Sequence, residues 1–166
     1  YNSFYLFISY CLILISNWSL KHLIVKQLYN YFDKKSFPIL GIGSRPNKAT
    51  GCSFVNDGII ATDYGMPSGH SQIAWAVATY IICKIIKHNY KKYKNNNKIV
   101  KILDYSWLIV SCIIILLVAL YISYSRVYIE GCHTIQQVII GGILGIVSGF
   151  IIYYFENDFI NLILNL

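Results

Sequence analysis

Apolar residues gather in four long segments of the chain, and polar or charged stretches separate them. Two of these segments, residues 105–125 and 134–155, contain no Asp, Glu, Lys or Arg. Each is long enough to cross a hydrocarbon core of roughly 30 Å as a helix, which takes about 20 residues. The segment before Lys21 is also uncharged, and another apolar run follows His70. The pattern predicts four helices, at about 4–29, 69–88, 102–124 and 134–155.

These segments predict an all-α fold, an integral membrane helical bundle of about four transmembrane helices with a long irregular loop at about 30–68. The first segment lacks a basic start and a small-residue cleavage site, so we expect a spanning helix and not a signal peptide. Residues 156–166 are expected to form a short amphipathic tail. The chain begins with Tyr1 and not with Met, which is consistent with a fragment that has lost upstream segments.

The composition excludes an ordinary soluble domain. Hydrophobic residues make up 56% of the 166 residues and charged residues only 13%, whereas soluble domains carry about 25% charged residues. This length suits one domain, so we expect a single domain over residues 1–166, with its motif-bearing core at about 17–155.

The net charge of +7 agrees with the rule that cytosolic loops of membrane proteins carry an excess of Lys and Arg. Residues 84–101 contain seven lysines, so we place this loop in the cytosol and expect no nucleic-acid partner. The helices that begin at about Ser68 and Thr134 then start on the opposite, lumenal or extracytoplasmic, side. Residues 21–48 add six basic residues to that side, which reduces the difference in positive charge between the two sides of the membrane. Four polar clusters should share this face: Lys21, Arg45-Pro46, Ser68-Gly69-His70, and Ser125-Arg126 with His133.

The five cysteines form no CxxC pair and no zinc-ligand spacing, and we expect no metal and no cofactor. Cys52 and Cys132 are both predicted outside the cytosol, and the sequence leaves open whether they form a disulfide. Cys11, Cys83 and Cys112 fall inside predicted helices and are interpreted as packing residues.

Gly141, Gly145 and Gly149 recur every four residues in the last predicted helix. Small residues on one face let membrane helices approach closely. We expect this face to serve packing within the chain, and a homo-oligomer interface is the alternative.

Two predicted helix starts carry a histidine beside groups that bind anions. Ser68 is a good N-cap residue, and the free backbone N–H groups of the turn that follows form an anion site around His70. Residues 134–137 fit a T-x-x-Q capping box directly after His133. Two helix N-termini with histidines are therefore expected to face one pocket.

Arg45 and Arg126 are the only arginines in the chain, and the planar guanidinium suits bidentate phosphate binding better than a lysine does. Two histidines beside this positive charge are typical of phosphoryl transfer, in which one acts as nucleophile and the other as proton donor. The residues themselves therefore indicate a site for phosphoryl transfer.

Three motifs, in this order, resemble the signature of the type 2 phosphatidic acid phosphatase superfamily. That pattern is K-x6-R-P, then P-S-G-H, then S-R-x5-H-x3-D, on a helical membrane core. The chain carries Arg45-Pro46, then Pro67-Ser68-Gly69-His70, then Ser125-Arg126 with His133. The resemblance extends over about residues 17–155. The stretch Tyr64–Gln72, with Trp75 and Tyr80 downstream, is most similar to the dolichyl-diphosphatase branch.

The resemblance implies a role for each matching residue. His133 would attack phosphorus and form a phosphohistidine that water then cleaves, and His70 would protonate the leaving oxygen. Gln137 would orient His133. The family requires no metal for this reaction. The phosphate would be held by the other candidates: Lys21, Arg45, Ser68, Gly69 and Arg126.

The chain departs from the family pattern in the position of the lysine. Pro38 stands seven residues before Arg45, where the pattern has Lys. The stretch from Asn17 to Lys21 is similar to the lysine-bearing helix end, with an insertion before Arg45. We therefore assign the role to Lys21, with Lys35 as the rival.

Two further departures concern the nucleophile. Six residues separate Arg126 from His133 in place of five, and the turn at residues 130–132 is expected to absorb the extra one. Gln137 stands where the family has the Asp that orients the nucleophilic histidine. An amide oxygen can accept an imidazole N–H but adds no charge. The alternative is that Gln137 only caps the helix.

The expected function is that of a membrane phosphatase that hydrolyses a lipid phosphate or polyprenyl diphosphate at the lumenal or extracytoplasmic face. Its partners would be this substrate and the membrane lipids. Two alternatives are a phosphatase of soluble sugar phosphates, like glucose-6-phosphatase, and a catalytically weak membrane protein that binds lipid phosphate. A panel of substrates that includes sugar phosphates would distinguish the first alternative from a lipid phosphatase. Phosphate trapped on His133 would argue against the second alternative.

Overall fold

The computed structural model describes residues 2–31, 45–46, 49–50, 52, 64–93 and 98–164. The N-terminal helical stretch consists of α1 (Asn2–Ser19), the π-helical turn η1 (Leu20–Val25) and α2 (Lys26–Tyr31). The later elements are α3 (Gly69–Tyr93), α4 (Lys98–Tyr124), the π-helical turn η2 (Ser125–Ile129) and α5 (Ile135–Leu164). No strand occurs among the described residues, and the predicted all-α fold is confirmed.

α3 and α5 extend well past their predicted ends, and α4 begins at Lys98, before its predicted start at about 102. α5 continues without a break to Leu164, so the predicted end of this helix at residue 155 is wrong, and the residues expected to form a short tail continue the helix. α3 likewise continues to Tyr93. Neither extension contains the Pro or Gly that commonly ends a helix.

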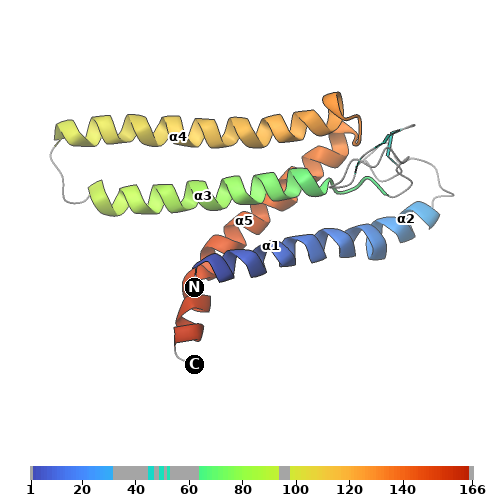
Figure 1. Cartoon of the computed structure of the whole chain (residues 1–166), viewed down its shortest axis with the longest axis horizontal. Helices are drawn as coiled ribbons and strands as arrows, with labels where there is room; N and C mark the ends of the chain where they lie inside the picture. The colour runs from blue at the N-terminus through green and yellow to red at the C-terminus, as the bar shows by residue number, and fades with distance from the viewer. Residues whose placement is uncertain are drawn as a thin grey trace.

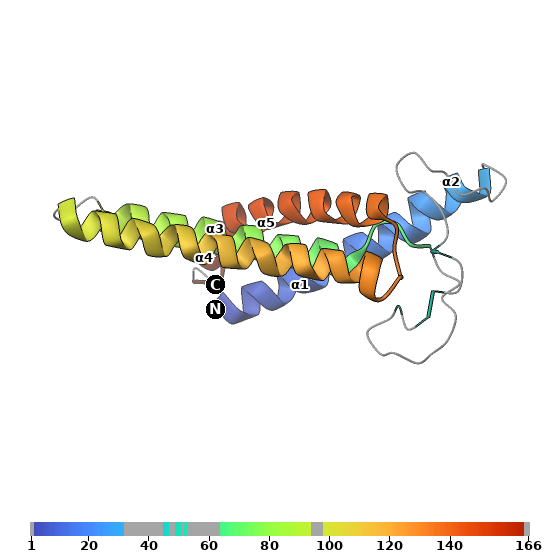
Figure 2. The same ribbon diagram turned by 90° about the horizontal axis from the view of Figure 1, so that it is seen from above.

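The helices form a bundle with α3 in the middle (Figures 1 and 2). α3 contacts α1, α4 and α5, most extensively α5. α4 runs antiparallel to α3, while α5 crosses them obliquely (Figure 1). The start of α3, the end of α4 with η2, and the start of α5 therefore lie at one end of the bundle, where the stretch from α1 to α2 also ends. This is the arrangement that the predicted topology requires for a shared site.

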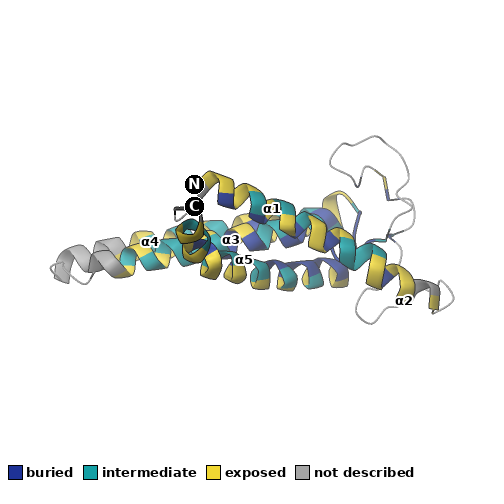
Figure 3. Cartoon of the chain, turned by 90° about the horizontal axis from the view of Figure 1, so that it is seen from below, coloured by how far each residue is buried: buried dark blue, intermediate teal, exposed yellow. Residues whose placement is uncertain are grey.

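Three helical stretches are long and apolar enough to cross a membrane: Ser3–Leu28, Tyr105–Ile129 and Ile135–Leu162. They match three of the four predicted spans, and the chain is an integral membrane protein. Many large apolar side chains, such as Trp107 and Leu117, are exposed on the outside of the bundle (Figure 3), where lipid would cover them. α3, the fourth predicted span, is less apolar, and three of its polar residues, Ser71, Gln72 and Thr79, are buried in the bundle.

The glycine face of α5 packs against α3, which confirms the predicted packing within the chain. A Cβ atom at Gly141 would lie 2.5 Å from the carbonyl oxygen of Ser68, and one at Gly145 would lie 2.3 Å from that of Gln72. Only glycine permits backbones to come this close. The contact brings the first turn of α5 against the start of α3, and the homo-oligomer alternative stays a prediction.

Hydrogen bonds between helices fix the register of α3 in the bundle. Near the shared end, Ser71 Oγ donates to the carbonyl oxygen of Val138 at 2.9 Å and lies 3.0 Å from Ser123 Oγ. Toward the other end, Lys84 Nζ contacts both carboxylate oxygens of the buried Glu156 at 2.7 Å. Polar groups inside a membrane bundle are costly unless they are paired, so these contacts favour one alignment of α3 against α4 and α5.

Candidate active site

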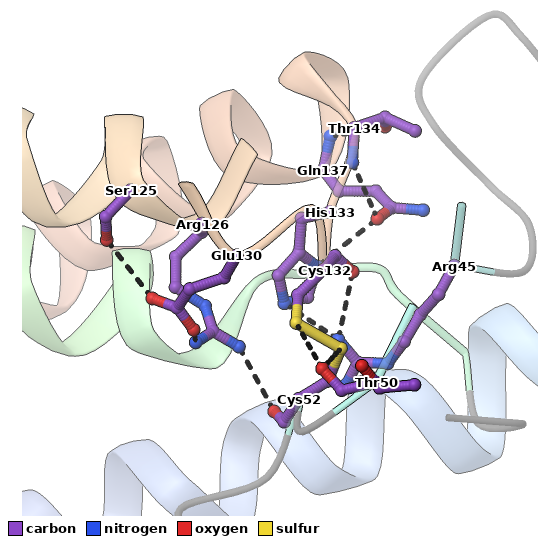
Figure 4. The surroundings of a disulfide bond; sticks show 10 residues. All are labelled: Arg45, Thr50, Cys52, Ser125, Arg126, Glu130, Cys132, His133, Thr134 and Gln137. Atoms are coloured by element: carbon purple, nitrogen blue, oxygen red, sulfur yellow. Dashed lines mark hydrogen bonds and ion pairs between the residues drawn. A yellow bond between two sulfur atoms is a disulfide. The ribbon is translucent and has the colours of Figure 1, made fainter. Parts of the chain in front are cut away.

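The turn between η2 and α5 carries His133 at the shared end of the bundle (Figure 4). The carbonyl oxygen of Arg126 accepts the backbone N–H groups of both Cys132, at 3.0 Å, and His133, at 3.1 Å. The His133 side chain is buried. The backbone of Arg126 therefore positions the predicted nucleophile directly.

A widened helical turn precedes this histidine. In η2 the backbone N–H of Glu130 donates to the carbonyl oxygen of Ser125 at 2.8 Å, the i→i+5 bond of a π-helix. Gly131 follows with a φ of 63°, which glycine adopts without steric cost. The segment that is predicted to absorb the extra residue of this chain therefore follows a π-helical turn and contains Gly131 in the left-handed conformation.

Both nitrogen atoms of the His133 ring have partners. Nδ1 lies 3.2 Å from Oε1 of Gln137, and Nε2 lies 3.0 Å from Nη1 of Arg45 (Figure 4). A guanidinium can only donate hydrogen bonds, so Nε2 accepts here and the ring proton is on Nδ1, which donates to Gln137. The imidazole is therefore neutral, and its lone pair is on Nε2.

The surroundings of His133 favour this neutral form. Burial, followed by the positive charges of Arg45, Arg126 and Lys21, lowers the pKa of His133 from 6.5 to about 3, against an opposite effect of the Gln137 hydrogen bond. The uncharged amide of Gln137 orients the ring. A carboxylate at the same place would add a negative charge and raise the pKa of His133 more than the amide does. The imidazole of the nucleophile candidate is therefore neutral at pH 7, with no proton on Nε2.

Gln137 is placed to cap α5 and to orient His133 at the same time. Its Oε1 accepts the backbone N–H of Thr134 at 3.2 Å, and Thr134 Oγ1 accepts the backbone N–H of Gln137 at 3.4 Å. This is the capping box that the sequence predicts. The backbone carbonyl of Gln137 also accepts the N–H of Ser68 at 3.1 Å. Gln137 thus links the nucleophile candidate to the start of α3.

Gly65 makes room for the Gln137 amide. A Cβ atom at residue 65 would lie 2.3 Å from Gln137 Oε1 and 2.6 Å from its Cδ. The backbone at Gly65 thus forms one wall of the space that holds the amide. The sequence motifs do not single out this residue, because a glycine shortly before Pro67 is common in any turn.

Replacing Gly65 by Ala should displace the Gln137 amide and release the His133 ring. We expect kcat for phosphate release to fall by about 10- to 100-fold, because misplacing a reacting group by about 1 Å costs roughly 10²-fold. KM should change little, because the arginines are untouched. Steady-state kinetics of the purified variant would measure both effects.

The matched control is the double variant Gly65→Ala with Gln137→Ala. The smaller side chain at residue 137 leaves room for the new methyl group, so Gly65→Ala should cost nothing more in that background. Additive losses in the double variant, or wild-type kcat in Gly65→Ala alone, would contradict this role for Gly65.

The two arginines reach the turn from different segments, and both are buried. Nη1 of Arg45 also donates to the carbonyl oxygen of Cys132 at 3.2 Å. Nη2 of Arg126 donates to the carbonyl oxygen of Cys52 at 3.1 Å, and its Nη1 pairs with Glu130. Among the residues that the structure describes here, one partly exposed carboxylate thus accompanies two guanidinium groups, and this local excess of positive charge suits an anionic ligand.

Two buried polar atoms, Ser68 Oγ and Arg126 Nε, have no hydrogen-bond partner within the part of the chain that the structure describes. Ser68 is fully buried and directly precedes α3. A buried polar group without a partner costs about 1–3 kcal/mol, and such groups are expected where a ligand completes the hydrogen bonding. An anion between the start of α3 and Arg126 would supply acceptors for both.

His70 and His133 share one electrostatic environment. His70 lies half-buried in the first turn of α3. The charges that act on it belong to Arg126, Glu130, Lys21 and Arg45. The three basic residues of this set also act on His133. Lys21, in η1, is therefore close enough to influence both rings, while its rival Lys35 lies outside the described residues, so the choice between them stays a prediction.

Asn17 and Gln72 form a buried polar pair beside the site that the sequence motifs do not single out. Asn17 Nδ2 donates to Gln72 Oε1 at 2.7 Å and to the carbonyl oxygen of Pro67 at 3.4 Å. The pair joins α1 to the segment that leads into α3. Its signal in the sequence is Asn17 itself, because a polar side chain within an apolar spanning helix indicates a function or a specific partner.

Cys52 and Cys132, whose pairing the sequence leaves open, form a disulfide with Cα atoms 5.5 Å apart (Figure 4). The bond joins residues 80 positions apart and connects the segment of Arg45 to the turn of His133. The three cysteines predicted inside helices are free.

The described candidate residues thus converge on one end of the bundle, and their catalytic and binding roles stay predictions. Direct contacts link Arg45, Gln137 and His133, and the Gln137 carbonyl extends this link to Ser68. Gly69 begins α3 directly after Ser68. His70, Arg126 and Lys21 join the group through the electrostatic interactions described above.

Comparison with known proteins agrees with the sequence motifs. The family model described as PAP2 superfamily matches residues 3–161. Dolichyldiphosphatase 1 of Homo sapiens is 40% identical over 86 residues, which cover 52% of this chain and 34% of the human protein. Dolichyldiphosphatase of Saccharomyces cerevisiae is 35% identical over 107 residues, which cover 63% of this chain and 38% of the yeast protein. The chain thus spans little more than a third of the length of these relatives, and no solved structure gives a significant match.

Proposed function

The chain belongs to the PAP2 superfamily, and we propose that it forms the active core of a membrane phosphatase that hydrolyses a lipid phosphate or polyprenyl diphosphate. The observation that carries this proposal is the neutral His133, whose Nε2 lies 3.0 Å from a guanidinium nitrogen of Arg45. Attack on an anionic phosphorus centre needs a lone pair and fixed positive charge around it. Both are present at this one nitrogen atom.

The positive end of the bundle would bind the phosphoryl group. Its oxygens would accept hydrogen bonds from Arg45, Arg126, Ser68 Oγ and the backbone N–H of Gly69, with the α3 dipole and Lys21 adding positive potential. An oxyanion that takes the N–H of Arg45 would release the His133 lone pair for attack. The guanidinium groups supply the positive charge that the transition state needs, so the proposal includes no metal and no cofactor.

In the proposed first step, His133 Nε2 forms a bond to phosphorus while the bond from phosphorus to the leaving oxygen breaks. His70 donates a proton to that oxygen. The Nδ1–H of His133 stays hydrogen-bonded to Gln137, which keeps the ring aligned. In the second step, His70 accepts a proton from water, the water oxygen forms a bond to phosphorus, and the bond from phosphorus to Nε2 of His133 breaks, so that inorganic phosphate leaves and the histidine is regenerated.

The proposed substrate and orientation have separate support. The similar proteins are named dolichyldiphosphatases, which favours a diphosphate on a long polyprenol. The lysine-rich stretch at residues 84–101 includes the last turns of α3 and the start of α4, at the end of the bundle away from the site. Because cytosolic segments carry an excess of positive charge, this favours a lumenal or extracytoplasmic site. The disulfide at the site favours the same side, because disulfides persist in oxidising compartments.

A phosphate-release assay with the full chain in detergent tests the proposed function. The substrates are a diacyl phosphate, a sphingoid phosphate, a polyprenyl diphosphate and a sugar phosphate. We expect hydrolysis of lipid substrates, fastest for the polyprenyl diphosphate, and little release from the sugar phosphate. The same preparation carrying His133→Ala provides the background. Release from the sugar phosphate alone, or binding of lipid phosphate without release from any substrate, would contradict the proposal in favour of one of the two alternatives.

A further inference from the structure

The Cys52–Cys132 disulfide lies between the two arginines of the candidate site. The carbonyl oxygen of Cys132 accepts a hydrogen bond from Arg45 Nη1 at 3.2 Å. The carbonyl oxygen of Cys52 accepts one from Arg126 Nη2 at 3.1 Å. Each half-cystine therefore orients one guanidinium group, and the S–S bond connects the two acceptors (Figure 4).

These contacts close a ring. The carbonyl oxygen of Arg126 accepts the backbone N–H of Cys132, Cys132 is bonded to Cys52, and the carbonyl oxygen of Cys52 accepts the Arg126 side chain. Cys52 and Cys132 are buried together with Ala49. The S–S bond is the one covalent link between distant residues in this ring, so it ties the backbone near Arg45 to the turn that follows Arg126.

We propose that Cys52 and Cys132 are positioning residues, whose disulfide holds the two guanidinium groups in a geometry that binds a phosphoryl group. The inference rests on the proposed function of the site but concerns the affinity for the anion, which can be measured without turnover. The two cysteines act through Arg45 and Arg126 and touch no reacting atom. With the link broken, the carbonyl acceptors separate and the two arginines lose their common orientation.

The chemistry of breaking the link is a two-electron reduction. A thiolate of dithiothreitol attacks one sulfur atom, the S–S bond breaks, and the second thiol of the reagent closes its own disulfide. Two cysteine thiols result, with the electrons supplied by dithiothreitol and the protons balanced by its two thiol groups. The free cysteines Cys11, Cys83 and Cys112 are first replaced by serine or alanine, so that reoxidation can form only the Cys52–Cys132 disulfide.

Binding of inorganic phosphate to this full-length background in detergent tests the proposal, by calorimetry before and after reduction. We expect reduction to weaken phosphate binding by about 10- to 100-fold, the range for losing hydrogen bonds of charged groups. Helical circular dichroism should be unchanged. Reoxidation should restore the affinity, and Cys52→Ser with Cys132→Ser should reproduce the weak binding and no longer respond to dithiothreitol.

A second variant separates positioning from general stability. With Arg45→Lys in the same background, the guanidinium that Cys132 orients is absent, so reduction should change phosphate affinity much less than in the parent chain. Equal affinity before and after reduction would overturn the proposal, and so would an equal loss in the Arg45→Lys chain. Loss of helical signal together with binding would also overturn it, because the disulfide would then support the fold in general. A chain that binds phosphate in this redox-dependent way but hydrolyses no substrate would remove the proposed function and leave this inference standing.

Discussion

His133→Ala should abolish phosphate release. We expect kcat/KM to fall by roughly 10⁴- to 10⁶-fold, the range for removal of a covalent nucleophile. The physical reason is that Nε2 of His133 carries the lone pair for attack. Arg45 contacts this nitrogen and Gln137 contacts Nδ1, so the two residues together orient the ring. Without it, water would have to attack the phosphate directly in a site that is built to hold an imidazole.

Trapping of the intermediate measures this role more directly than the rate does. Wild-type chain quenched during turnover of ³²P-labelled substrate should retain label that is stable to base and labile to acid, as a phosphohistidine is. The label should be absent from His133→Ala and present in His88→Ala, a matched replacement of an exposed histidine on α3. Label of the same lability in the His133→Ala chain would assign the nucleophile to another residue.

The acidity of His133 predicts the pH dependence of this step. Its pKa is lowered to about 3, so His133 of the free chain should stay neutral down to about pH 4. An ordinary histidine, with a pKa of about 6.5, would already be protonated between about pH 4 and pH 6. The acid limb of kcat/KM should therefore belong to another group. Gln137→Glu adds a negative charge at the Nδ1 side, which should raise the pKa of His133 and shift its loss of activity to higher pH.

His70→Ala should lower kcat by about 10²- to 10⁴-fold with a polyprenyl diphosphate or alkyl phosphate, as expected for loss of general acid–base catalysis. His70 lies in the first turn of α3, among the same basic residues that surround His133. From there we expect it to reach the leaving oxygen in the proposed complex. The loss arises because an alkoxide or phosphate leaving group departs poorly without a proton.

A leaving group that needs no proton separates this role from a structural one. With p-nitrophenyl phosphate, the His70→Ala variant should still form the phosphohistidine at His133. This intermediate should then accumulate, because activation of the attacking water also needs His70. His88→Ala again serves as the control. An equal loss with both kinds of leaving group, or failure of the variant to form any phosphohistidine, would contradict proton donation by His70.

Much of the fold can be derived from the sequence because lipid imposes a simple rule. A spanning segment must satisfy its own backbone hydrogen bonds, so uncharged stretches of about 20 residues predict helices. The prediction is wrong at the C-terminus, where α5 continues past Phe155 into more polar residues. Hydrophobicity marks the part of a helix inside the membrane and carries little information about how far the helix extends beyond it.

The gathering of the candidate residues also follows from the sequence, through topology. Alternating spans place the start of α3, the end of α4 and the start of α5 at one end of the bundle, which brings the motifs around His70, Arg126 and His133 together. The capping box at Thr134 and Gln137 is local, and local hydrogen bonds can be predicted from residue spacing.

Only the tertiary structure decided which contacts form between distant segments. The Cys52–Cys132 pairing, the fit of the Gln137 amide against Gly65 and the Asn17–Gln72 pair all depend on distances that residue spacing does not specify. The sequence by itself determined an apolar helical bundle with its polar motifs at one end, because burial and helix periodicity are properties of single segments. The orientation of the imidazole and guanidinium groups depends on the packing of several segments at once, and that is settled only when the chain is folded.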